Sequence, residues 1–62
     1  MPHYRAYVLD GNNTIQRAAD YDYDTDDLAV AALIVIYPVE TIELWSGSRR
    51  VIRLRAGAIV AD

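Results

Sequence analysis

The sequence has no cysteine and only one histidine, His3. Disulfides and thiolate metal sites are therefore excluded, and one imidazole builds a zinc site only with several carboxylate partners. A chain of 62 residues forms one domain with a marginal core, because a domain near this size buries only about 60% of its unfolded surface. Self-association is then the first candidate for the missing stability.

Long apolar runs and a recognisable targeting segment are absent too. The uncharged run at residues 28–37 spans ten positions, whereas a membrane-spanning helix needs about 20. The opening MPHYRAYVLD lacks the charged start and apolar stretch of a signal peptide. We therefore expect a soluble, cytoplasmic protein with no membrane partner.

Positive charge is scarce and unevenly placed. The formal net charge is −3 and the sequence pI is about 4.8, whereas a phosphate-binding footprint needs the opposite sign. Every acidic residue except Asp62 lies within the first 43 positions, while four of the six basic residues lie between Arg49 and Arg55. Nucleic acid is therefore a disfavoured partner.

The remaining sequence, 53% hydrophobic, is typical of a globular protein. Alternating apolar residues around turn-forming DGNN and SGS predict two hairpins. The predicted strands cover residues 3–10, 14–21, 40–45 and 49–55, and residues 56–62 are a tail or a short edge extension. A helix is predicted over 25–37, because Asp24 or Thr25 can cap its first turn and Pro38 ends it.

This order of elements predicts the α+β class. We expect a ββαββ fold with a four-stranded, mostly antiparallel sheet and the helix on one face. The side chains expected to face the helix are Tyr4, Ala6, Val8, Ile42, Leu44, Ile52 and Leu54. The sequence leaves the strand order and the hairpin registers open.

The helix is more apolar than one sheet requires. The i, i+3, i+4, i+7 spacing predicts that Leu28, Ala31, Ala32 and Val35 cover the sheet. A second apolar set is then left on the other faces of the helix, and soluble monomers rarely expose such a patch. We therefore predict a homodimer whose interface is formed by Val30, Leu33, Ile34 and Tyr37. Pairing of edge strands is the alternative geometry for such a dimer.

Three short motifs resemble a group of very small, uncharacterised bacterial proteins. They are Tyr-Arg-Ala-Tyr at residues 4–7, Glu-Leu-Trp at residues 43–45, and Arg49 or Arg50 after the next turn. The resemblance covers most of the chain but departs at residues 28–37, where the relatives are more polar. It implies a bacterial, cytoplasmic setting and no assigned activity.

Two specific functions, calcium binding and tautomerase catalysis, are suggested by short motifs but are not supported by the rest of the sequence. Asp20, Asp22 and Asp24 have the 1, 3, 5 spacing of a calcium loop, but Thr25 and Ala31 stand where that loop needs glycine and glutamate. Removal of the first methionine would leave Pro2 as the amine that tautomerases use. Such enzymes need a long helix directly after the first strand, whereas here a turn and a second strand are predicted.

The most suggestive surface is an arginine-rich face on the second hairpin. Aromatic rings and guanidinium groups can stack on bases or bind anions. The candidates for a ligand or partner face are therefore Trp45, Arg49, Arg53 and Arg55. The structural alternative is cross-strand pairing of Glu43 with Arg53.

No catalytic constellation, cofactor motif or metal-ligand spacing is found. The prediction is a non-enzymatic interaction module acting as a homodimer. Binding of nucleic acid or a small anion is the alternative, and a Pro2-dependent enzyme is third.

Overall fold

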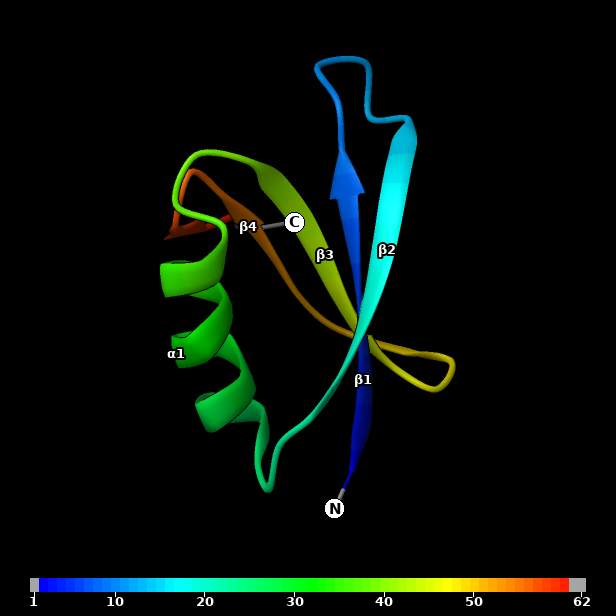
Figure 1. Ribbon diagram of the computed structural model, residues 1–62, viewed down its shortest axis with the longest axis vertical. Coiled ribbons are helices and arrows are strands. Elements are labelled where there is room, and N and C mark those ends of the chain that lie inside the picture. The colour runs from blue at the N-terminus through cyan, green and yellow to red at the C-terminus, as the bar shows by residue number, and fades with distance from the viewer. Residues whose placement is uncertain (1, 61–62) are drawn as a thin grey trace.

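The computed structural model describes residues 2–60 and has one helix on one face of an antiparallel sheet (Figure 1). The sheet has five strands in the order β2-β1-β3-β4-β5. The elements are β1 His3–Leu9, β2 Ile15–Asp22, α1 Asp26–Ile36, β3 Thr41–Ser46, β4 Arg49–Arg55 and β5 Ala58–Ile59. The α+β class is confirmed, and the prediction of four strands is one short.

The fifth strand lies inside the predicted tail. Ala56 and Gly57 have φ angles of 49° and 77°, and such positive values at two successive residues suit the tight turn of a hairpin. This turn places Ala58 and Ile59 opposite the end of β4. Residues 61–62 of the predicted tail lie outside the described part of the chain.

The first hairpin is closed by the side chain of Asp10. Its carboxylate accepts hydrogen bonds from the backbone N–H groups of Asn12 and Thr14, at 2.8 and 2.9 Å. Asn13 takes a φ of 61°, which asparagine tolerates better than most residues. β1 then lies between β2 and β3 and is antiparallel to both.

Helix α1 begins and ends at locally encoded signals. The hydroxyl of Thr25, the residue before the helix, accepts a hydrogen bond from the Leu28 N–H at 3.2 Å, which satisfies a free amide of the first turn. Tyr37 leaves the helical conformation, although its N–H still bonds to the Leu33 carbonyl. Pro38 follows it, where a helix cannot continue. Within residues 2–60, no helix is long and apolar enough to cross a membrane.

The core lies between α1 and the sheet. Six of the seven side chains predicted to face the helix are buried, and the seventh, Ile52, packs partly buried against them. The helix contributes Ala29, Leu33 and Tyr37 to the same core. Alternation along β1, β3 and β4 therefore assigned the inner face of the sheet correctly.

The predicted faces of the helix are wrong. Leu28 and Val35, expected against the sheet, are 53% and 78% exposed. Leu33, expected at an interface, is fully buried. The physical reason is that residues 28–37 carry no charge, so apolar stripes of equal quality run along both sides of the helix.

Candidate functional site

The face of the sheet opposite α1 carries most of the polar and aromatic side chains of the strands. Cross-strand partners share a face of a sheet, and the registers pair Arg5 with both Asp20 and Trp45. We call this surface the open face. Its members are His3, Arg5, Tyr7, Asp20, Asp22, Glu43, Trp45, Arg50, Arg53 and Arg55.

Glu43 organises the centre of the open face. Its carboxylate accepts hydrogen bonds from the guanidinium of Arg53 and, at 3.3 Å, from the indole N–H of Trp45. Arg50 lies 3.6 Å from the same carboxylate. Hydrogen bonding to Arg53, followed by that to Trp45, lowers the pKa of the half-buried Glu43 below its usual value against the effect of burial. The predicted Glu43–Arg53 pair is therefore present.

Arg49 does not lie on the open face, contrary to prediction. The register shifts between Leu44 and Trp45, so that Trp45 pairs with Arg50 and Ser46 pairs with Arg49. This irregularity reverses the side on which Arg49 projects. Its guanidinium bonds to Asp26 at 3.1 Å, and the same carboxylate accepts a hydrogen bond from the buried Tyr4 hydroxyl at 2.7 Å. Arg49 thus ties the start of α1 to the sheet.

A second polar network lies at the other side of the open face. Asp20 accepts a hydrogen bond from Arg5 at 2.8 Å and lies 3.2 Å from one ring nitrogen of His3. The other ring nitrogen lies 3.1 Å from Asp22. The two carboxylates, Asp22 first, raise the pKa of His3 above 6.5, while Arg5 lowers the pKa of Asp20.

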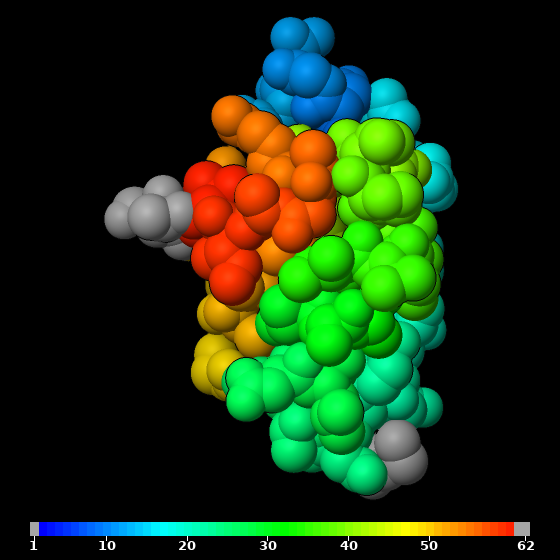
Figure 2. Space-filling view, turned by 90° about the vertical axis from the view of Figure 1, so that its left-hand side faces the viewer, coloured from blue at the N-terminus to red at the C-terminus, as the bar shows by residue number. Residues whose placement is uncertain are grey.

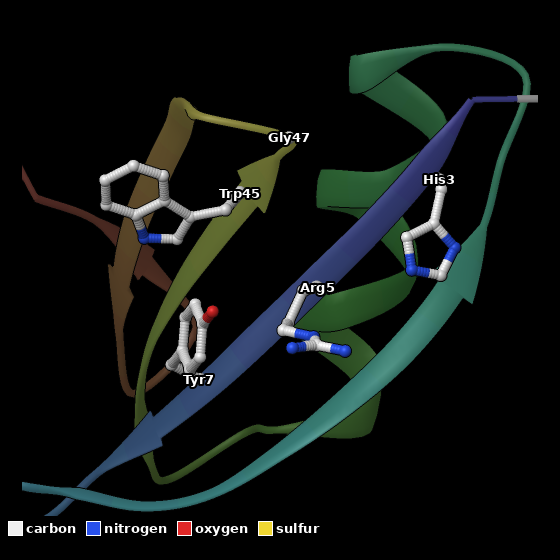
Figure 3. Close-up of a pocket in the computed structure, with 5 residues that line it drawn as sticks. All are labelled: His3, Arg5, Tyr7, Trp45 and Gly47. Atoms are coloured by element: carbon white, nitrogen blue, oxygen red, sulfur yellow. The ribbon is translucent and has the colours of Figure 1, made fainter.

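A shallow hollow opens between these two networks (Figure 3). Its volume is about 230 Å³ and it is lined by His3, Arg5, Tyr7, Trp45 and Gly47. In Figure 3 the labelled side chains stand on the side of the sheet away from the helix, with Arg5 between His3 and Tyr7. Gly47 lies in the turn after β3, where a β-carbon would meet nothing within 4 Å.

The hollow brings together residues that the sequence analysis had separated. Trp45 was predicted as a candidate for a ligand or partner face, whereas His3, Arg5 and Tyr7 were not among the candidates. Their common face follows from the burial of Tyr4, Ala6 and Val8, because alternate residues of a strand project oppositely. Their position beside Trp45 depends on the β1–β3 register, which the sequence left open.

The second candidate surface is the outer side of α1. Its stripe consists of Leu28, Ala31, Val35 and Ile36, and Val39 follows just beyond the helix. The Cγ2 atom of Ile34 lies 3.6 Å from the β-carbon position of Gly57, so the C-terminal hairpin borders the helix. Figure 2 shows both segments, green and red, as one continuous surface. Exposed Ile59 lies in that hairpin.

Among residues 2–60, no group of three His, Asp or Glu side chains is placed to hold a metal ion. The aspartates of the acidic run instead serve different contacts: Asp20 and Asp22 hold His3, while Asp24 precedes the cap of α1. Pro2 precedes β1 directly, and its carbonyl accepts a hydrogen bond from the Tyr23 N–H.

Comparison with known proteins gives no relative. The chain matches no family model, no curated protein and no solved structure. The open face and the outer side of α1 are therefore the features that bear on its function.

Proposed function

We propose that the protein is a small, non-enzymatic interaction module that works as a homodimer through the outer side of α1. One observation carries the proposal: after Asp27 the helix has no charged residue, although its outer side faces water. Val35, at the middle of that side, is 78% exposed. A helix that covers a single sheet ordinarily has a polar outer side.

The size of the apolar surface supports pairing. The exposed apolar surface on this side amounts to on the order of 500 Å² per chain, near the upper limit for the largest patch on a soluble monomer. Its members are Leu28, Val35, Ile36, Val39 and Ile59. Pairing two such surfaces buries on the order of 1,000 Å² in total, about where specific interfaces begin.

A second copy is the occupant that this surface fits best. A two-fold interface brings the same patch of both copies together, so the patch must complement itself. An uncharged stripe meets this condition, because no charge meets its own copy across the axis. Ala31 is a small exposed residue of the stripe, which lets two helices approach closely. Pairing also supplies burial that a 62-residue core provides only marginally.

Binding of nucleic acid by the arginines of β4 has less support. Arg49 is held by Asp26 on the helix side, and Arg53 is held by Glu43. The chain carries a net charge of −3, which opposes attraction to phosphates. Arg55 remains an exposed arginine on the open face.

Oligomeric mass measured by sedimentation equilibrium tests the dimer. We expect twice the chain mass of 7.0 kDa for the unmodified protein and the single-chain mass for Val35→Glu, which places a charge in each half of the interface. The matched control is Ile15→Glu, because Ile15 is also an exposed aliphatic residue (57%) but lies on β2. Ile15→Glu should remain dimeric.

A lower limit can be given for the loss of dimer affinity caused by Val35→Glu. Removing a buried valine costs about 1.5–3 kcal/mol, and a symmetric dimer loses two of them, so the dissociation constant should rise at least about a hundredfold. A single-chain mass for the unmodified protein at tens of micromolar, or equal dissociation by both variants, would refute the proposed interface.

A further inference from the structure

The hollow on the open face combines two kinds of group that can bind a ligand together, aromatic rings and a cation. Its lining includes two aromatic rings, Tyr7 and Trp45, with the cationic Arg5 between them and His3 (Figure 3). These groups come from β1 and β3, whose register sets Arg5 directly opposite Trp45. The hollow is therefore built by the centre of the sheet, on the side that α1 does not cover.

Trp45 is held in place by a hydrogen bond that leaves the face of its indole ring available for stacking. Its indole N–H donates to Glu43, and Glu43 is in turn fixed by Arg53. The indole is therefore anchored through its edge, while its ring lines the hollow. A ring held this way before binding loses little conformational freedom when a planar molecule stacks on it.

Arg5 is held in the same manner. Asp20 accepts from its Nε and Nη2 atoms, at 2.8 and 3.3 Å. A guanidinium has five N–H groups in a fixed plane, and besides those that face Asp20, Arg5 also hydrogen-bonds to Tyr7, another residue that lines the hollow. Asp20 thus fixes the orientation of Arg5 and leaves donors for a ligand.

We propose that this hollow binds a small planar aromatic carboxylate, with its ring against Trp45 and Tyr7 and its carboxylate at Arg5. The volume of about 230 Å³ lies below the roughly 300–1,000 Å³ of drug-sized pockets, so one or two fused rings fill it. This site lies on the other side of the sheet from α1 and does not depend on the dimer.

The charges around the hollow favour one negative charge over two. The open face carries four arginines against three carboxylates, so it has one excess positive charge when His3 is neutral. One ligand charge balances this excess, and a second would be repelled by Asp20 and Asp22, which lie beside Arg5 and His3. A monoanionic carboxylate therefore fits, whereas a dianionic phosphate is penalised. The same repulsion disfavours a nucleic-acid backbone, which brings a charge with every residue.

Nuclear magnetic resonance tests the site directly, because Trp45 is the single tryptophan and its indole N–H gives one identifiable signal. The probes share one ring system: 2-naphthoate, neutral 2-naphthamide and dianionic 2-naphthyl phosphate, each titrated to about 10 mM. We expect a saturable shift with 2-naphthoate and at least about tenfold weaker binding of the other two probes. The amide has no charge to pair with Arg5, and the second charge of the phosphate is repelled by Asp20 and Asp22.

Three variants separate the hollow from the rest of the open face. Arg5→Gln should weaken binding of 2-naphthoate about tenfold or more, and it should fold because its surface ion pair contributes little stability. Arg55→Gln is the matched control, since Arg55 lies on the same face but outside the hollow. Tyr7→Leu, which removes a ring without touching the charges, should also weaken binding.

Any of three results would overturn the proposal. The first is the absence of a saturable shift with 2-naphthoate. The second is equal weakening by Arg5→Gln and Arg55→Gln. The third is binding of the amide or the phosphate as tight as that of the carboxylate. Each can occur whether or not the chain dimerises, so the two proposals fail independently.

Discussion

Two identical substitutions on α1 test which side of the helix is buried. Leu33→Ala removes a side chain that is fully buried between the helix and the sheet, whereas Leu28→Ala shortens one that is 53% exposed. Both replace leucine by alanine within one helix, and both residues are strong helix formers. A difference between the variants therefore reports packing rather than helix propensity.

The expected difference is large relative to the stability of so small a domain. Leu33→Ala should lower the free energy of unfolding by about 2–5 kcal/mol, because it leaves a cavity in the core. Leu28→Ala should cost less than about 1 kcal/mol in the separated chain, because half of the Leu28 side chain is already in water. A domain of 62 residues has roughly 3–9 kcal/mol in all, so Leu33→Ala removes a large share.

Urea denaturation followed by far-ultraviolet circular dichroism measures both values. The series is run at several protein concentrations, because dimerisation adds a concentration-dependent contribution to which Leu28 belongs. At the lowest concentration the difference between the variants should be greatest. Equal costs there, or a larger cost for Leu28→Ala than for Leu33→Ala, would refute the assigned orientation of α1.

Two further predictions concern the polar networks of the open face. Glu43→Gln should lower the free energy of unfolding by about 1–2 kcal/mol, since it weakens a half-buried, charge-assisted contact to Arg53. Asp20→Asn should cost less, because its ion pair with Arg5 is exposed to water. Equal costs of the two substitutions in urea denaturation would contradict this difference. His3 should titrate above pH 6.5, because Asp22 and Asp20 raise its pKa. Its contribution to stability is then complete below pH 6.5 and is lost as the pH rises through the raised pKa. Its ring-proton resonances measure this directly, and a midpoint at or below 6.5 would show that the carboxylates do not hold the ring.

The strands were predictable because their signals are local. Alternation with period two, interrupted by DGNN and SGS, marks two hairpins without reference to the rest of the chain. Choosing Tyr4, Ala6 and Val8 for the core was equally local, because the competing set contains Arg5. These features required no knowledge of how the two hairpins meet.

The spacing of apolar residues was not sufficient to predict which side of α1 faces the sheet. All positions from Leu28 to Tyr37 are apolar, so the spacing of hydrophobic residues fits several orientations. Asp27 narrows the choice. A charged residue faces solvent, so Asp27 excludes orientations that turn it toward the sheet, and Ala29, nearly opposite Asp27 on a helical wheel, is buried. Asp27 alone is not sufficient, because Ile36 lies directly opposite it and is 45% exposed.

The position of Arg49 depended on an irregularity that alternation cannot reveal. The register shift between Leu44 and Trp45 turns Arg49 toward the helix and puts Arg50 beside Trp45. The hollow could not be predicted from the sequence for a related reason. It needs β1 beside β3, and the contact between strands distant in sequence is set by the packing of the whole domain.

Contacts between copies give the most direct test of self-association through α1. In a 1:1 mixture of 13C-labelled and unlabelled protein, isotope-filtered nuclear Overhauser spectra record only contacts between chains. The methyl groups of Leu28, Val35 and Ile36, which are exposed in the single chain, should give such contacts. Contacts from Ile15 on β2 in their place, or no contacts between chains at millimolar concentration, would contradict the proposed dimer.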